Sequence, residues 1–148
     1  MNRWRLAWLK CFGAEIDGVP FVHQRARIQI PWNLSMAHRS CLGDRATAYS
    51  LGRISLGAGA VIAQEAYLCA GTHDFDSPDW PLITAQINIG RGVFIGARAF
   101  LHPGISVGDF AIVGAGSIVT RDVESLVVCA GNPARAIGRR AEPVVSLA

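Results

Sequence analysis

Aliphatic residues recur at intervals of six along most of this chain, and that period constrains the fold more than any other feature. From residue 83 onward the anchors of the period are Ile83, Ile89, Ile95, Leu101, Val107, Val113 and Val119. The same step connects Leu56, Ile62 and Leu68, and before them Met36, Leu42 and Ala48. A period of six matches neither an α-helix nor a single amphipathic strand. Short strands joined by tight bends produce it when a chain coils around a narrow interior.

Two further regularities support this interpretation. Four positions after each anchor stands a second small or aliphatic residue, and neither position carries a charge. Glycine often follows the anchor directly, where a corner would demand a backbone conformation that a Cβ resists; examples are Gly43, Gly57, Gly90, Gly96, Gly108 and Gly114. Three hexads make a coil of about 18 residues, so aliphatic side chains of successive coils stack ~4.8 Å apart. We therefore predict an all-β fold, a parallel β-helix of hexapeptide repeats.

The period of six, which we call the lattice, is interrupted twice. Ile54 and Ser55 are two extra residues, and the nine residues 74–82, DFDSPDWPL, separate the hexads that start at residues 68 and 83. A polar insertion of this length cannot fit inside the stack, so a loop at about 74–82 is predicted to project outward. Loops held on a rigid scaffold are where functional residues concentrate.

The composition excludes several classes of protein. With 148 residues, 51% hydrophobic and 17% charged, the chain fits a single folded domain spanning 1–148. No apolar run approaches the ~18 residues of a membrane span, and Arg5 and Lys10 interrupt the early apolar stretch, so a signal peptide does not fit. We therefore expect a cytoplasmic protein. The net charge of +3 comes from scattered arginines, which disfavours a nucleic-acid-binding stripe.

The four cysteines lack the spacing of a zinc or redox site. Zinc ribbons and dithiol motifs need closely paired cysteines, and no CxxC pair occurs among Cys11, Cys41, Cys69 and Cys129. We expect all four to be reduced, buried thiols.

Residues 1–15 are predicted to form an N-terminal cap helix, 16–124 the coils and 125–148 a C-terminal tail. The apolar residues that share one face at helical spacing are Trp4, Trp8, Leu9 and Phe12. An open end of a β-helix exposes apolar interior and unpaired strand edges, so this face is expected to cover it. The alternative is that this basic, Trp-rich helix rests on an anionic membrane surface, as a peripheral contact at the inner membrane face.

Three longer motifs carry more specific information than the period. They are GTHDFDSPDWPLITA at 71–85, VGAGSIVTRDV at 113–123 and AGNPARAIG at 130–138, accompanied by PWNL at 31–34. With these motifs the chain resembles the hexapeptide-repeat acyltransferases, most closely the sugar O-acetyltransferase branch attached to colanic acid and related exopolysaccharide synthesis. The resemblance implies that the β-helix is left-handed, which the period itself does not reveal. It also implies transfer of an acetyl group from acetyl-CoA by a homotrimer whose active sites lie between subunits.

His73, in the GTHD motif, matches the family's catalytic histidine. A sugar hydroxyl is a poor nucleophile until a base removes its proton, and histidine can accept a proton near neutral pH. His73 ends a hexad at the mouth of the projecting loop, which would be reachable from solvent. We expect it to be the general base; the alternative is a solvated surface histidine.

The other three histidines, His23, His38 and His102, are expected to be structural or solvated. The carbonic anhydrases that share the repeat need three zinc-binding histidines, two of them close in sequence. The nearest pair here, His23 and His38, is fifteen residues apart, so no metal is expected.

Acceptor contacts are expected around the projecting loop. Asp76, or less so Asp74, could orient the imidazole or accept a hydrogen bond from a sugar, although aspartate also favours plain turns. Trp80 could stack on a sugar, but packing against a neighbouring subunit is favoured. Ser50 aligns with a position where related sugar acetyltransferases carry asparagine, and its hydroxyl could still hydrogen-bond an acceptor.

The resemblance also implies that the extended arm of coenzyme A lies along the β-helix, between adjacent subunits. The positions concerned are Ala97, Ala115, Arg121, Asn132, Pro133 and Arg135. At the two alanines, small side chains let the pantetheine approach backbone amides. The two arginines resemble phosphate-contacting positions, with a solvated corner as the alternative for the first of them. The Asn-Pro pair is expected to shape the turn near the adenine.

Two functions are consistent with these residues. The favoured one is an acyl-CoA-dependent O-acetyltransferase acting on a small-molecule or lipid-linked sugar acceptor. The other is a noncatalytic β-helix binding or scaffold protein that has lost turnover, indicated only by Ser50. Substitution of His73 distinguishes them.

Overall fold

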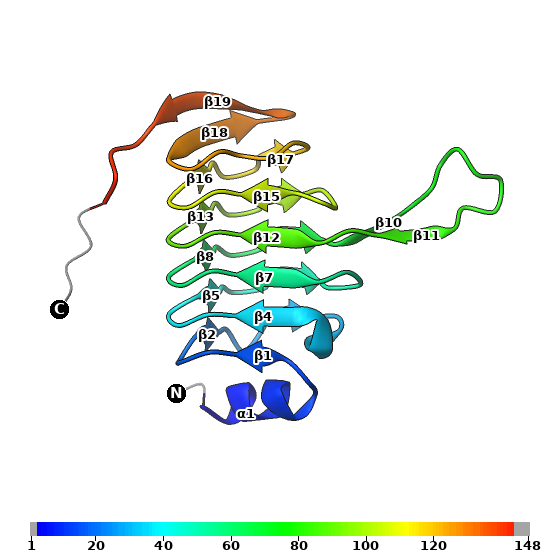
Figure 1. Cartoon of the computed structure of the whole chain (residues 1–148), viewed down its shortest axis with the longest axis vertical. Helices are drawn as coiled ribbons and strands as arrows, with labels where there is room; N and C mark the ends of the chain where they lie inside the picture. Colours follow the sequence, from blue (N-terminus) through cyan, green and yellow to red (C-terminus); the bar gives the residue numbers. More distant parts are fainter. Residues whose placement is uncertain (1–2, 144–148) are drawn as a thin grey trace.

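Short strands separated by tight corners wind into a stack of coils, with one helix at the N-terminal end and a two-stranded arm projecting from the side (Figure 1). The computed structural model describes residues 3–143. Parallel pairing joins strands of successive coils and builds three faces, which we name sheets A, B and C. The predicted parallel β-helix is confirmed.

Sheets A and C have five strands each and sheet B has seven. Sheet A contains β1 (Glu15–Ile16), β4 (Leu34–Met36), β7 (Ile54–Leu56), β12 (Ile87–Ile89) and β15 (Ser106–Val107). Sheet B contains β2 (Phe21–Val22), β5 (Cys41–Leu42), β8 (Val61–Ile62), β13 (Phe94–Ile95), β16 (Ile112–Val113), β18 (Val127–Gly131) and β19 (Ala134–Arg139). Sheet C contains β3 (Arg27–Ile28), β6 (Thr47–Tyr49), β9 (Tyr67–Cys69), β14 (Phe100–Leu101) and β17 (Ile118–Val119). A 3-10 turn, η1 (Pro31–Asn33), precedes β4.

The lattice residues form the core, as predicted. Twelve of the thirteen anchors are buried, and Ile95, for example, lies in register between Ile62 below and Val113 above. Ile83 is the exception, because it lies on the arm and is 43% exposed. Stacking of like aliphatic side chains, coil on coil, therefore provides the hydrophobic stabilisation of the fold.

The glycines that follow the anchors are required by close stacking rather than by an unusual backbone conformation. A Cβ on Gly96 would lie 2.5 Å from the backbone nitrogen of Ala115, and one on Gly57 would lie 2.6 Å from the backbone of Gly90. The left-handed conformation occurs two residues later, at Arg98 (φ 59°) and Gly59 (φ 68°). The prediction that these glycines lie at corners is therefore confirmed, but the reason is the close approach of the next coil and not an unusual backbone conformation.

Two boundaries differ from the sequence-based expectation. Ile54 and Ser55 are not extra residues, since they lie in β7 and pair with β4 and β12; the insertion falls in the corner that precedes β7. The coils also continue past residue 124, because β18 pairs in parallel with β16 and β19 folds back on it antiparallel. The predicted extra residues and the start of the predicted tail were therefore misplaced.

The N-terminal cap is present, but the predicted face is wrong in part. Helix α1 (Arg3–Cys11) buries Leu6 and Leu9 against the first coil, whereas Trp4 and Trp8 are exposed. Two leucines are enough to cover the narrow end of the stack. Within residues 3–143, α1 is the one α-helix, and it is too short and not apolar enough to span a bilayer.

The cysteines differ in accessibility, and this yields the first testable prediction. Contrary to expectation, Cys11 is exposed and Cys41 and Cys69 are half-buried, so only Cys129 is buried as predicted. Burial raises the pKa of the Cys41, Cys69 and Cys129 thiols. Because the thiolate is the reactive form, a thiol reagent at neutral pH should label one cysteine rapidly in the native protein and all four in denaturant. Cys11→Ser should remove the fast phase; rapid labelling that persists in this variant would contradict the assignment.

Candidate active site

The projecting segment is a β-hairpin rather than an irregular loop, and it is longer than predicted. Strands β10 (Gly71–His73) and β11 (Leu82–Thr84) pair antiparallel, with His73 opposite Leu82. The arm leaves the stack after β9 of sheet C and returns at β12 of sheet A, so it stands at the corner between these sheets (Figure 1). Residues 74–81 form the tip region and the two strands form the stalk.

His73 lies at the end of β10 with its side chain exposed. Its Nδ1 lies 2.6 Å from the carbonyl oxygen of Trp80. A carbonyl can only accept, so Nδ1 carries the proton in the neutral ring and Nε2 keeps its lone pair. The arrangement fixes both the tautomer and the direction of the ring, and leaves Nε2 able to accept a proton from a bound group.

Backbone, not a carboxylate, orients this imidazole. Trp80 has a φ of +48°, unusual for a residue with a side chain, and its N–H donates to the carbonyl of Ser77 at 3.1 Å. This tight turn directs the Trp80 carbonyl at His73. A contact with a backbone carbonyl does not depend on residue type and could not be predicted from the sequence. The sequence had instead suggested an aspartate as the group that orients the ring.

The two aspartates expected to contact the base or the acceptor, Asp74 and Asp76, have different surroundings. Asp74 is part of the turn: its carboxylate accepts the N–H of Asp76 at 3.0 Å, and its own N–H donates to the carbonyl of Pro81 at 2.9 Å. Asp76 is exposed near the tip. The structure therefore assigns Asp74 to turn chemistry and leaves Asp76, like the neighbouring exposed Asp79, available to a ligand.

The Trp80 ring packs within the arm. It meets the ring of Phe75 edge-on, with centroids 5.7 Å apart, and remains 58% exposed. Both aromatic rings therefore present large apolar surfaces to whatever lies beside the arm.

The predicted coenzyme A positions gather along a different corner, between sheets B and C. Ala97 follows β13 and Ala115 follows β16, one coil apart, and the N–H of Gly116 donates to the carbonyl of Ala97 at 2.8 Å. The turn between β18 and β19 continues this column, with a cis peptide between Asn132 and Pro133. The structure brings these four residues into one column of small side chains and turns.

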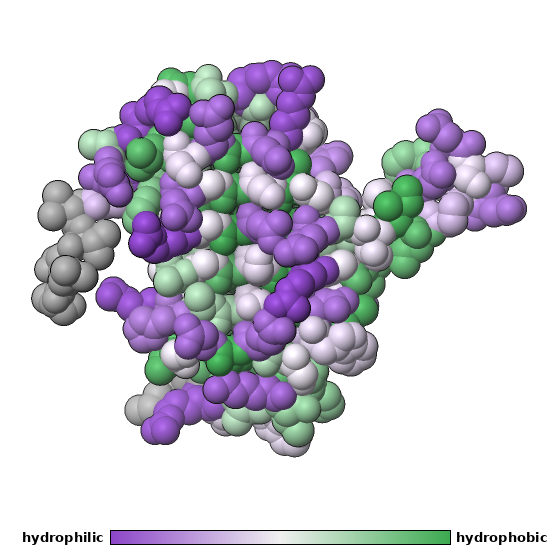
Figure 2. Space-filling model, in the orientation of Figure 1, coloured by the Kyte–Doolittle hydropathy of each residue, from purple (hydrophilic) through white to green (hydrophobic). Residues whose placement is uncertain are grey.

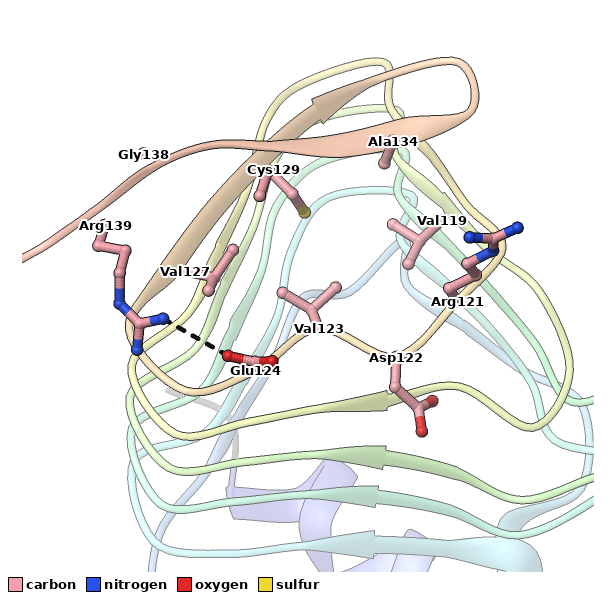
Figure 3. Close-up of a pocket in the computed structure, with 11 residues that line it drawn as sticks. Val119, Arg121, Asp122, Val123, Glu124, Val127, Cys129, Ala134, Gly138 and Arg139 are labelled. Atoms are coloured by element: carbon pink, nitrogen blue, oxygen red, sulfur yellow. Dashed lines mark hydrogen bonds and ion pairs between the residues drawn. The ribbon is translucent and has the colours of Figure 1, made fainter.

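The two predicted phosphate-binding arginines lie apart in the topology. Arg135 is exposed at the start of β19, next to the top of the column. Arg121 follows β17 at the corner between sheets C and A, where it lines a cavity of about 420 Å³ beneath β19 (Figure 3). Valine side chains and Cys129 form the apolar part of that cavity, and Arg139 pairs with Glu124 across its edge at 3.4 Å. Arg135 thus adjoins the column, and Arg121 belongs to the open end of the stack.

Arg98 is a cation beside the column that the motifs did not single out. It occupies the corner position after Ala97, and its Nε donates to Glu65 at 2.5 Å. This hydrogen bond and the charge of Arg98, with a further contribution from Arg45, lower the pKa of Glu65. A basic residue directly after an alanine of the column was the available sequence signal.

Ser50 has a structural role. It is fully buried, its Oγ accepts the N–H of Ile30, and its hydroxyl donates to the carbonyl of the same residue, both at 2.9 Å. Asn33, in the PWNL motif, secures the same corner by donating to the carbonyls of Ser50 and Leu51. This burial argues against the expected acceptor contact, because the hydroxyl has no exposed surface to offer.

The remaining histidines are held by local contacts. His38 accepts the N–H of Val19 at 3.2 Å, His23 lies 3.2 Å from Asp44, and His102 packs edge-on against Phe100. Across residues 3–143, no three His, Cys, Asp or Glu side chains cluster in a way that could hold a metal ion. His38 is also exposed, but its Nδ1 is occupied by the N–H of Val19 and its Nε2 then carries the proton, whereas in His73 Nδ1 carries the proton and Nε2 keeps its lone pair.

Comparison with known proteins agrees with the fold and the motifs. Residues 86–121 match the family model described as the hexapeptide repeat of succinyl-transferase. The acetyltransferase WcaF of Escherichia coli (strain K12), which is named for colanic acid biosynthesis, is 38% identical over 142 residues, covering 96% of this chain and 78% of that protein.

Two solved structures share the fold at 25% sequence identity. A maltose O-acetyltransferase from Clostridium difficile 630 superposes with a TM-score of 0.86, covering 95% of this chain and 76% of that one. A galactoside acetyltransferase in complex with coenzyme A gives 0.85, covering 93% and 70%. Together with the identity to WcaF across nearly the whole chain, these matches show that the chain belongs to the hexapeptide-repeat acetyltransferase family.

Proposed function

We propose that this protein transfers an acetyl group from acetyl-CoA to a hydroxyl of a sugar or exopolysaccharide precursor, with His73 as the general base. The observation that carries the proposal is the contact of the His73 Nδ1 with the Trp80 carbonyl, which leaves Nε2 free on an exposed arm. The relatives support the substrates, since they are named for colanic acid biosynthesis, maltose and galactoside, and the last was solved with coenzyme A.

The proposed chemistry needs one proton acceptor and no metal. Nε2 of His73 takes the proton of the acceptor hydroxyl while the oxygen attacks the thioester carbonyl carbon, forming a C–O bond. The C–S bond then breaks, and the imidazolium returns its proton to the departing sulfur, so the products are the acetyl ester and CoA thiol. The Trp80 carbonyl stabilises the imidazolium through Nδ1, as it stabilises the neutral ring.

The arm supports an active site shared between subunits. An isolated two-stranded hairpin is marginally stable in water, yet this one exposes Phe75, Trp80, Leu82 and Ile83. Figure 2 shows hydrophobic residues on the arm close to the stack and hydrophilic residues toward its tip. Apolar surface of this kind is expected to pack on a neighbour, which would place His73 against another chain.

The topology points the same way. His73 stands at the corner between sheets C and A, whereas Ala97 and Ala115 lie at the corner between sheets B and C. Within one chain, sheet C therefore separates the proposed general base, His73, from the proposed donor column at Ala97 and Ala115. We propose that the arm of one subunit reaches the column of the next, in a homotrimer.

Sheet B supplies a second apolar surface for assembly. Its outward row, in register from the first coil to the last, is Phe21, Cys41, Val61, Phe94, Ile112 and Val128. A continuous stripe of this composition is typical of an interface between copies of a chain. Light scattering should give the mass of three chains; a monomer with full activity would contradict the shared site.

The donor site can be tested on the column itself. Ala115→Trp places an indole on the proposed path of the pantetheine, so the acetyl-CoA concentration for half-maximal rate should rise at least ~10-fold. Ala115 is exposed, so the fold should tolerate the substitution. Ala58→Trp, at an exposed corner between sheets A and B, is the matched control and should leave that concentration unchanged. If the two variants raised the half-maximal acetyl-CoA concentration equally, the proposal that acetyl-CoA binds at the corner of Ala115 would be wrong.

The scaffold alternative has lost its one indication. Ser50 is buried and hydrogen-bonded to Ile30, so its difference from asparagine concerns the packing of a corner and does not signal lost turnover.

The activity is tested by an acceptor screen. The purified protein is incubated with acetyl-CoA and a panel of sugars, sugar nucleotides and lipid-linked sugars, and both released CoA thiol and product mass are measured. We expect thiol release to be stimulated by an acceptor that gains one acetyl group as an ester. Hydroxylamine-resistant products would indicate amine acylation, and no stimulation by any acceptor would favour the scaffold alternative.

A further inference from the structure

The N-terminal end of the stack carries an exposed aromatic surface that the proposed transfer reaction does not use. Helix α1 lies across this end (Figure 1), with Leu6 and Leu9 turned toward the core. On its other side Trp4 is 62% exposed and Trp8 is 56% exposed. Capping and surface presentation are therefore divided between opposite faces of one short helix.

Two more aromatic residues extend this surface. Phe12, 55% exposed, stacks on Trp8 with ring centroids 6.0 Å apart. Trp32, 62% exposed, belongs to η1 but lies beside the end of the helix, because a Cβ on Gly13 would be 2.9 Å from its Cβ. Four large rings on one end of a small domain exceed what scattered surface residues explain.

The charge around these rings is positive. Helix α1 contains Arg3, Arg5 and Lys10 and has no acidic residue. Arg5 lies over the Trp4 ring, 5.9 Å from its centroid, and donates to the carbonyl of Ala26 at 3.2 Å. A groove of about 570 Å³ between the helix and the first coil is lined by aromatic residues and by Arg5 and Arg27, with no acidic side chain among its lining.

The acidic residues that follow the helix change this little. Glu15 is paired with Arg53, which donates a hydrogen bond to it, and Asp17 lies further along, after β1. The surface formed by α1, Trp32 and Arg27, which we call the aromatic-basic end, therefore keeps an excess of positive charge.

We propose that the aromatic-basic end docks the protein on an anionic lipid surface. Tryptophan and phenylalanine rings settle at the level of lipid headgroups, and arginine and lysine at the same depth pair with lipid phosphates and anionic headgroups. A second copy of this chain does not fit this surface, because it would set Arg3, Arg5 and Lys10 against the same cations. The inference is independent of His73 and of the acceptor.

The test uses the full-length protein and vesicles of two compositions. Sedimentation with phosphatidylcholine vesicles is compared with vesicles containing about one third phosphatidylglycerol, with tryptophan fluorescence as a second readout. We expect binding to the anionic vesicles with a blue shift of the emission, weak binding to the neutral ones, and loss of binding as salt is raised.

Paired variants separate ring insertion from charge. Trp4→Ala with Trp8→Ala should weaken vesicle binding about tenfold or more, and Arg3→Gln with Lys10→Gln about 25-fold, at roughly fivefold for each charge. The matched controls lie elsewhere: Trp80→Ala on the arm, and Arg121→Gln with Arg140→Gln near the C-terminal end. The controls should bind vesicles like the wild type, and circular dichroism should show an unchanged fold in all variants.

Three results would overturn the proposal. They are no preference for anionic vesicles, equal binding by the Trp4/Trp8 variant and the wild type, and equal loss in the Trp80 control. Concentration-dependent self-association without lipid, abolished by the Trp4/Trp8 substitutions, would assign the surface to a second copy instead. Loss of acetyl transfer in the screen would leave the lipid result unchanged, so the two proposals fail separately.

Discussion

Replacing His73 with alanine is expected to lower the turnover number at least ~100-fold, because general-base assistance typically contributes about 10² to 10⁴ in rate. The imidazole is exposed and makes one polar contact in the structure, with the Trp80 carbonyl, so its removal leaves the core intact. The half-saturating concentration of acetyl-CoA should stay near the wild-type value, since the proposed donor contacts are made by the column and His73 acts on the acceptor hydroxyl. Thiol release at saturating donor and acceptor measures the effect.

The matched control for this variant is His102→Ala. His102 is also exposed, but it lies on sheet C against Phe100, outside the arm. Its substitution should change turnover less than about twofold. If His73→Ala retained wild-type turnover while folded, another group would have to take the proton, and the assignment of the base would be wrong.

The second large effect concerns the core. Ile95→Ala should reduce the free energy of unfolding by about 2 to 5 kcal/mol, the range for truncating a fully buried aliphatic side chain. Ile95 has no exposed surface and is held between Ile62 and Val113 of the adjacent coils, so neither neighbour can move in to fill the space. A shift of the denaturant midpoint, at matched protein concentration, measures the loss.

Gln64→Ala is the control for the core variant. Gln64 is exposed at the corner that follows Ile62, one coil below Ile95, and its truncation should change the free energy of unfolding by less than about 0.5 kcal/mol. Equal destabilisation by the two variants would show that the stacked aliphatic side chains of the core do not stabilise the fold.

The period of six identified the core because each coil meets only its neighbours, so a local rule is repeated along the chain. It failed at Ile83, which keeps the spacing but lies on the arm. Counting cannot distinguish these cases, because the arm is defined by antiparallel pairing of β10 with β11 rather than by composition. The same count also missed that Ile54 lies inside a strand.

The candidate site was predictable where side chains define it. The resemblance of the GTHD motif to the family's pattern indicated His73, and the same resemblance indicated Ala97 and Ala115, which the structure stacks at one corner; their roles stay predictions. The group that orients His73 is a backbone carbonyl, presented by the left-handed conformation of Trp80, and no residue pattern announces it. For Ser50 the motif comparison wrongly suggested a ligand contact. Its burial depends on a hydrogen bond to Ile30 of the preceding coil, which the sequence pattern does not reveal.

The exposed arm and the partly exposed outward row of sheet B are the main support for the proposal that one chain does not complete the site. The measurement that tests this most directly is complementation between His73→Ala and Ala115→Trp chains, co-expressed with different tags and purified as mixed oligomers. The assay uses acetyl-CoA well below the half-saturating concentration of the wild type, where each variant alone is strongly impaired. If the arm of one chain serves the column of the next, every mixed trimer contains one intact site of three, so the purified mixed trimers should show about a third of wild-type turnover. Mixed oligomers no more active than the Ala115→Trp parent under the same conditions would contradict a shared site.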